Sequence, residues 1–107
     1  MIARTWRGAV RTDDAAAYAR YLETTGKPAS LGTQGNHGFA VLSRPAGERT
    51  VILTISLWES LESIRSFAGD DVERAVFFPE DDAFLVERDL HVDHWQVDEA
   101  SFIEGLG

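Results

Sequence analysis

The side chains best suited to proton transfer in this chain are its histidines, and His94 is the leading candidate. It lies in the run HVDHWQV, on the same face of a predicted strand as Leu90 and Val92, and we expect that face to point inward. A buried neutral imidazole can accept a proton from a phenol or hydrogen-bond to it. The alternative is a structural histidine satisfied by backbone or water.

His37 is the second candidate, at the junction of a loop and a strand in Gly35-Asn36-His37-Gly38. Flanking glycines allow a ligand to approach the backbone closely, so His37 could border the mouth of a pocket. A plain surface turn is the alternative. His37 and His94 could bind a metal together with Glu59, but nothing in their spacing requires this, and we predict no metal.

Aromatic side chains could form the wall of such a pocket. Trp6 and Trp58 can each fill the core or bind a planar ligand, and Phe77 and Phe78 with Trp58 would keep water out. The hydroxyl of Tyr18, like that of its neighbour Tyr21, must find a partner if it is buried and could reach into the pocket.

Three arginines lie on predicted strands, at positions 4, 7 and 44. Arg4, Arg7 and Arg44 could anchor an acidic ligand, or they could pair with acidic residues across a dimer interface, which is the interpretation we favour.

Composition excludes several classes of function. The 107 residues carry a net charge of −8 and no cysteine. Disulfides and thiolate metal sites are therefore excluded, and without a basic cluster we predict no nucleic-acid partner. No apolar run approaches the roughly 20 residues that span a bilayer. The amino terminus reads as a strand and not as a signal peptide, so we expect no membrane partner and a cytoplasmic location.

The first half of the chain alternates strands with a helix. Residues 2–10 and 49–58 predict strands, and 39–44 predicts another that joins 49–58 through a hairpin turn. Residues 15–25 predict a helix that ends at Gly26-Lys27-Pro28, with 29–36 as a loop. The strand 49–58 is apolar at nearly every position, so we expect it to be central and covered on both faces.

The second half predicts a broken helix and a closing strand. Ser60 should cap a helix that ends at Gly69, with a buried stripe made of Leu61, Ile64, Phe67 and Ala68. A second short helix should start at Asp70 or Asp71 and run toward Phe77. Residues 87–97 predict the last strand, and 98–107 a tail or a segment exchanged with a partner.

This order is β-α-β-β-α-β, the ferredoxin-like α+β pattern in which helices cover one face of an antiparallel sheet. We expect one domain over residues 1–107. The opposite face of the sheet needs a cover that the chain does not supply, so we expect a homodimer.

The chain resembles the antibiotic biosynthesis monooxygenase-like family of the dimeric α+β-barrel superfamily. The resemblance covers nearly the whole chain in element order, and its most specific residues are Trp58-Glu59-Ser60, Ile64, Phe67, Gly69, Asp70 and His94. The superfamily includes quinone-forming monooxygenases, haem-degrading enzymes and lactone isomerases. In the haem degraders, a histidine that binds iron aligns with Phe77 and a tryptophan of the pocket with Phe67. Because phenyl rings cannot ligate iron, we predict no haem and no other cofactor.

The cofactor-free monooxygenases of the family are more similar to this chain. Their pocket carries an amide at the position of Thr54 and a phenol at the position of Ile64. Thr54 can still donate a hydrogen bond to a substrate oxygen, whereas Ile64 can only pack. The resemblance implies a cofactor-independent monooxygenase for an aromatic or polyketide-like small molecule, with His94 or Thr54 favouring the ionised substrate. The alternatives are an isomerase or cyclase that uses His94 for proton transfer, and a non-enzymatic metabolite-binding or stress-response protein.

Overall fold

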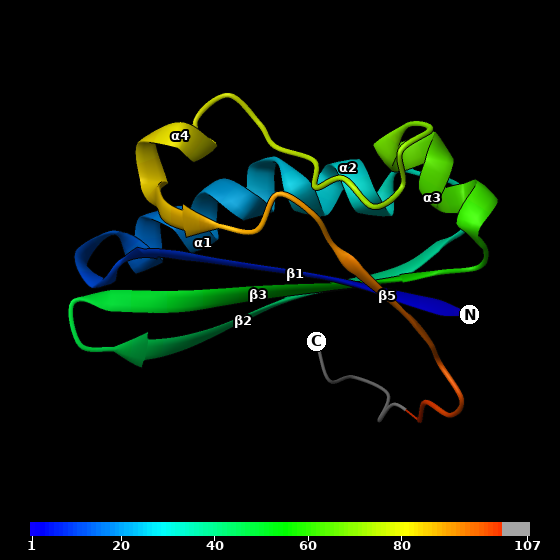
Figure 1. Cartoon of the computed structure of the whole chain (residues 1–107), viewed down its shortest axis with the longest axis horizontal. Helices are drawn as coiled ribbons and strands as arrows, with labels where there is room; N and C mark the ends of the chain where they lie inside the picture. The colour runs from blue at the N-terminus through cyan, green and yellow to red at the C-terminus, as the bar shows by residue number, and fades with distance from the viewer. Residues whose placement is uncertain (102–107) are drawn as a thin grey trace.

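The computed structural model describes residues 1–101, which are organised around one antiparallel sheet. The elements follow in the order β1 (Ile2–Arg11), η1 (Thr12–Asp14), α1 (Ala15–Thr24), α2 (Gly26–Leu31), β2 (Asn36–Ala46), β3 (Arg49–Trp58), α3 (Leu61–Ala68), α4 (Asp81–Phe84), β4 (Leu85–Arg88) and β5 (Asp93–Gln96). The sheet order is β2-β3-β1-β4, and β5 pairs with the other end of β1. All the helices lie on one face of the sheet (Figure 1), so the predicted ferredoxin-like α+β fold is confirmed.

Alternation along the strands separates a helix-covered face from an open face. In the pairing of β1 with β3, Trp6 lies opposite Thr54 and Val10 lies opposite Thr50. The side chains at these alternate positions point toward the helices. Val10 and Ile52 form the hydrophobic core with Tyr18 and Leu22 of α1. The helix face therefore carries both the core and whatever space the helices enclose.

The predicted bounds and central place of β3 are confirmed, whereas one chain supplies a cover for only one of its two faces. Residues 49–58 form the strand as expected, between β2 and β1. Only one of its faces meets helices, and Leu53 and Ile55 on the other face stay partly exposed within one chain. A fully apolar strand here does not mean that one chain covers both sides.

The predicted end of the first helix is confirmed to within one residue, since α1 ends at Thr24, but the loop predicted from residue 29 begins too early. The backbone breaks at Thr25 (φ −124°, ψ −82°), and a new helix, α2, begins at Gly26. Pro28 lies in the first turn of α2, where its missing N–H removes no helical hydrogen bond. Residues 29–31 are consequently helical, and the loop begins at Gly32.

The helix α3 follows its local signals. The Ser60 hydroxyl accepts a hydrogen bond from the Ser63 N–H at 3.2 Å, and Gly69 ends the helix with φ +89°. Of the predicted stripe, Ile64 is fully buried and Phe67 and Ala68 are partly buried. Leu61 was predicted inside but is 42% exposed.

The predicted helix after Asp70 is absent, and a helical turn occurs only at α4. The intervening residues form an irregular stretch, of which we call residues 72–78 the covering segment. Its backbone pairs with the chain near β5: the Ala75 N–H donates to Leu90 O (2.9 Å), and the Val92 N–H donates to Glu73 O (2.8 Å). Because those groups pair with the covering segment, the predicted strand 87–97 is split into β4 and β5. Leu90, predicted to face inward beside His94, is 61% exposed.

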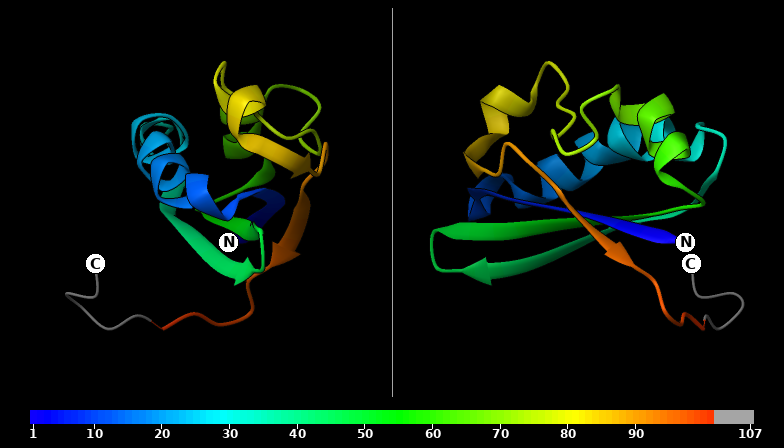
Figure 2. Two further views of the ribbon diagram at one scale, coloured as in Figure 1. Left: turned by 90° about the vertical axis from the view of Figure 1, so that its left-hand side faces the viewer. Right: turned by 45° about the vertical axis from the view of Figure 1, so that its right-hand side comes forward.

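Residues 97–101 leave β5 without regular structure and run on the side of the sheet opposite the helices (Figure 2). The remainder of the predicted tail or exchanged segment, 102–107, lies outside the described residues.

Within residues 1–101, no helix is long and apolar enough to cross a membrane. The cytoplasmic location stays a prediction.

Gly8 makes room for Trp6, and this gives a test of the packing. A Cβ at Gly8 would lie 2.5 Å from the Trp6 ring, so Gly8→Ala should lower the free energy of unfolding by about 1–3 kcal/mol. Gly38→Ala is the matched control in another strand of the sheet, β2, because its Cβ would meet only a Leu57 methyl at 3.9 Å. Urea unfolding followed by circular dichroism measures both; equal stability of the two variants would contradict the packing.

Candidate functional site

A cavity of about 60 Å³ lies between the sheet and the helices. The strands β1 and β3 contribute two side chains each to its floor, Arg4 and Trp6 with Thr54 and Ser56. The helices and the covering segment supply most of the remaining wall, including Tyr18, Ser30, Phe67, Phe77, Phe78 and Asp81. Aromatic rings alternate in this wall with a few polar groups, the usual make-up of a small-molecule site.

Arg4 is the most unusual group in the cavity wall, because it is a cation of which only 5% is exposed. Its Nη1 donates to Val72 O and lies 3.1 Å from His94 Nε2, and its Nη2 donates to Arg74 O at 2.9 Å. The guanidinium also lies over the Phe67 ring, 5.9 Å from the ring centre. Burial lowers the pKa of Arg4 to about 10, which still leaves it charged at neutral pH.

His94 contacts the cavity through Arg4, since it is absent from the lining itself. An arginine can only donate hydrogen bonds, so His94 Nε2 must accept, and the imidazole is neutral with its proton on Nδ1. Burial, followed by the charge of Arg4, lowers the pKa of His94 and favours the same neutral form. With Nε2 engaged, His94 is poorly placed to remove a proton from a ligand.

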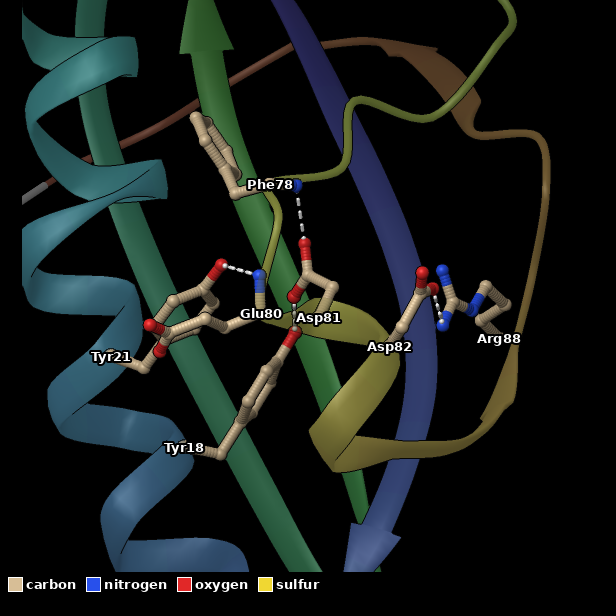
Figure 3. A network of polar contacts seen from close by, with 7 residues as sticks. All are labelled: Tyr18, Tyr21, Phe78, Glu80, Asp81, Asp82 and Arg88. Atoms are coloured by element: carbon tan, nitrogen blue, oxygen red, sulfur yellow. Dashed lines mark hydrogen bonds and ion pairs between the residues drawn. The ribbon is translucent and has the colours of Figure 1, made fainter.

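Tyr18 and Asp81 both line the cavity and form a buried polar pair, whose contact is drawn in Figure 3. The Tyr18 hydroxyl donates to Asp81 Oδ1 at 3.0 Å, and the Phe78 N–H donates to Oδ2 at 2.7 Å. The Asp81 N–H also donates to the backbone carbonyl Phe78 O at 3.0 Å, which closes a turn over residues 78–81. Both carboxylate oxygens are therefore occupied, and they fix the position of Phe78 at the cavity.

Trp6 is fixed at the edge of the cavity. Its indole N–H donates to Asp89 O at 2.8 Å, and its ring meets Phe77 edge-on at a centre distance of 6.0 Å. Arg88 lies 4.7 Å over the same phenyl ring. These contacts hold Phe77 between two partners and favour a stable aromatic wall.

The structure brings together five of the residues selected from the sequence. Thr54, Trp6, Tyr18, Phe77 and Phe78 all line the cavity.

Three other selected residues lie elsewhere. Trp58 is fully buried behind the lining, packed on Phe67 at 5.3 Å, with its N–H donated to the Ser56 hydroxyl at 2.8 Å. His37 is exposed at an irregularity in the pairing of β2 with β3 and is not part of the wall. His94 does not line the cavity and is connected to it through its contact with Arg4.

Sequence reasoning missed Arg4, Ser56 and Asp81 as parts of the wall. Arg4 has the same strand phase as Trp6, so alternation could have placed it inside, but its charge led us to favour an interface. Ser56 could have been found in the same way, since it pairs with Arg4. Asp81 had no comparable signal, because its contact with Tyr18 joins residues 63 positions apart.

Within residues 1–101, no three His, Cys, Asp or Glu side chains are placed to hold a metal ion together. His37, His94 and Glu59 therefore do not assemble into a site. Phe77, aligned by resemblance with an iron-binding histidine, does face the cavity, but a phenyl ring offers no donor to iron.

Comparison with known proteins shows a similarity in fold. The sequence matches no family model and no curated protein. Among solved structures, the chain is similar to a Bacillus cereus protein described as a putative antibiotic biosynthesis monooxygenase. The two share 16% sequence identity and a TM-score of 0.61, over 96% of this chain and 98% of the other. This likeness establishes that the chain has the fold implied by the resemblance.

The buried pair of Tyr18 and Asp81 predicts a measurable loss in Tyr18→Phe. The substitution leaves Asp81 Oδ1 without its donor, so the free energy of unfolding at neutral pH should fall by about 1–3 kcal/mol. Tyr21→Phe is the control, since the Tyr21 hydroxyl accepts from Glu80 N–H in an exposed position and should matter less.

The same variant should change the pH dependence of stability. Burial, and then Asp81, raises the pKa of Tyr18 above its usual value of 10.0, so the unfolded chain loses this proton first. Wild-type stability should therefore fall as the pH rises through 10.0, and less so in Tyr18→Phe. Arg4, with a pKa lowered to about 10, acts in the opposite sense but is present in both proteins. Urea titrations at fixed protein concentration measure the two curves, and parallel curves would contradict the assignment.

Proposed function

We propose that this protein is a cofactor-independent monooxygenase that acts on an aromatic or polyketide-like small molecule. The observation that carries the proposal is the cavity, in which Thr54 lies among aromatic rings between the sheet and the helices. The similarity in fold to a protein described as a putative antibiotic biosynthesis monooxygenase supports the same direction, as an analogy.

The chemistry that fits this cavity is the oxidation of a phenol by molecular oxygen. The phenol ring would pack against Trp6 and Phe77, and the Thr54 hydroxyl would donate to the phenol oxygen and favour its ionised form. The electron-rich ring carbon then forms a bond to oxygen, and cleavage of the O–O bond leaves one oxygen atom on the ring as a quinone carbonyl. The other oxygen atom leaves as water with two hydrogens of the substrate, so the substrate supplies all four electrons.

The size of the cavity adds a requirement. About 60 Å³ admits a few water molecules, whereas sites for drug-sized ligands measure roughly 300–1,000 Å³. A substrate must therefore displace part of the wall. The covering segment is the part of the wall that lies outside regular helices and strands, and opening it would break the contacts that hold Phe77 and Phe78. Its closure behind the substrate would exclude water from the reactive anion.

The isomerase or cyclase alternative depends on His94 as a free base. The contact between His94 Nε2 and Arg4 works against it, because the lone pair that would take the proton is already engaged. The monooxygenase proposal needs no such base once the phenol is held as its anion.

We also propose that the working unit is a homodimer joined through the open face of the sheet. In one chain this face carries Leu53 and Ile55 in its centre, Leu42 45% exposed toward one edge, and Trp95 58% exposed toward the other. Apolar side chains in that arrangement gain free energy by leaving water. A second copy offers the same surface and thus a self-complementary cover.

Oxygen uptake with 1-naphthol tests the proposed activity. Wild-type protein should consume one oxygen molecule per molecule of quinone formed, without added cofactor. Thr54→Val keeps the shape but removes the hydroxyl, so kcat/KM should fall about 10- to 100-fold. Thr24→Val, the same change at an exposed position on α1, is the control. Absence of uptake across a panel of naphthols and related phenols would reject the activity, and unchanged uptake in His94→Ala would remove His94 from the reaction.

Analytical ultracentrifugation at micromolar concentration tests the dimer. Wild-type protein should sediment as a dimer, and Leu53→Glu should give a monomer because it places a charge in the centre of the open face. Leu61→Glu, at a 42% exposed position on α3, is the matched control and should remain dimeric. A monomeric wild-type protein would contradict the proposal.

A further inference from the structure

Arg4 is a buried cation without an anionic partner in residues 1–101. Its hydrogen-bonding neighbours are two backbone carbonyls and a neutral imidazole, none of which carries negative charge. The two ion pairs among the described residues involve Arg49 and Arg88, not Arg4. Buried charges are normally paired, because removing a lone ion from water costs several kcal/mol.

The acids nearest to this region do not fill that role. Glu73 and Asp93 act on the pKa of His94, but both are exposed and neither pairs with Arg4. Asp81 lines the same cavity, but Tyr18 and the Phe78 N–H occupy its two oxygens. The positive charge of Arg4 therefore remains uncompensated at the cavity wall.

Arg4 also retains hydrogen-bonding capacity. A guanidinium has five N–H groups, and three have protein partners here, two on Nη1 and one on Nη2. The Nε–H and one N–H of Nη2 are left over. No side-chain nitrogen of residues 1–101 is both fully buried and without a partner, so the Nε–H reaches accessible space. Arg4 lines the cavity, which is the space available to it.

Ser56 adds a second donor beside Arg4. The two residues face each other in the register of β1 and β3, and both line the cavity. The Ser56 oxygen accepts the indole N–H of Trp58 at 2.8 Å, which leaves the Ser56 O–H free to donate. Ser56 is only 6% exposed, so its O–H is shielded from bulk water. The bond from the buried Trp58 indole restricts the orientation of the hydroxyl.

We propose that Arg4 and Ser56 form an anion-binding subsite that holds the ionised oxygen of an aromatic ligand, a phenolate or an arylcarboxylate. The inference rests on the proposed function in placing the ligand in the same cavity, and it adds the charge of the substrate. The guanidinium and the hydroxyl donate to the anion, while Phe67 and the other rings of the wall contact the aromatic body. His94, by accepting from Nη1, is a positioning residue that orients the guanidinium.

A purely structural role for Arg4 is the competing explanation. Its bonds to Val72 O and Arg74 O fasten the covering segment to the sheet, and these bonds could be its whole purpose. That role predicts no preference between charged and neutral ligands. The two explanations therefore differ in how the unmodified protein treats matched ligands.

Calorimetric titration of the wild-type protein with benzoate and benzamide makes this comparison. The two probes have nearly the same shape and differ in charge, so the subsite should bind benzoate at least tenfold more tightly. A second probe, 4-nitrophenol, distinguishes phenolate from carboxylate binding, because the bound phenol should ionise at lower pH and show the yellow absorbance of its anion. Equal affinity for benzoate and benzamide, or no binding of either, together with an unshifted 4-nitrophenol titration, would overturn the proposal.

Variants locate the effect. Arg4→Gln should abolish the preference for benzoate, and Ser56→Ala should reduce it several-fold. Arg20→Gln removes the same charge from an exposed position on α1 and should leave the preference intact. Loss of the preference in Arg20→Gln as well would mean that net charge, not the subsite, selects the ligand. The wild-type comparison decides the proposal even if Arg4→Gln fails to fold.

These measurements need no oxygen, so they separate the two proposals. A preference for the anion without oxygen uptake would keep the subsite and reject the monooxygenase. Uptake by a protein that binds benzoate and benzamide equally and leaves the 4-nitrophenol titration unshifted would keep the activity and reject the subsite.

Discussion

The attachment of the covering segment to the sheet is the constraint on which the cavity depends. That segment has no helix of its own to pack through, and its place is fixed by polar bonds to distant residues. Arg4 donates to the carbonyls of residues 72 and 74 from near the start of β1, and Asp81 of α4 holds the Phe78 N–H at the far end. Phe77 and Phe78, which these attachments place, form part of the cavity wall. The sheet and α4 therefore position the site through a buried cation and a buried carboxylate, not through apolar packing alone.

The sequence predicted the elements whose signals are local. The alternation of residues 49–58 and the Ser60 cap both act within a few residues, and both are found as expected. The segment after Asp70 could not be predicted in this way. Its composition allows a helix, but pairing of Ala75 with Leu90 and of Glu73 with Val92 replaces the helix and also divides the last strand. Such pairing depends on where the two stretches meet in space, which no local pattern records.

The candidate site shows the same division. Strand phase correctly predicts a shared face for Trp6 and Thr54, because alternation is a property of each strand alone. Two other guides were poorer: Trp58, which the resemblance supported, lies behind the wall, and His37, selected for its flanking glycines, lies outside it. For Arg4 we favoured a role at a dimer interface over a role in anchoring a ligand, and its strand phase was not used; buried arginines are rare unless paired. The buried position of Arg4 in the structure is therefore an uncommon one for an unpaired arginine. Because it is uncommon, it points to a specific role for this residue.

The net charge of −8 bears on how an anionic ligand could be selected. An acidic surface does not attract anions from a distance, and salt screens exposed charges beyond about 8 Å under physiological conditions. Selection must then occur after entry, where Arg4 acts at short range in a cavity shielded from water. In such a site an anion gains both a charge partner and hydrogen bonds, whereas a neutral ligand leaves Arg4 uncompensated. The acidic exterior and the buried cation are thus compatible, because one governs encounter and the other governs which ligand remains bound.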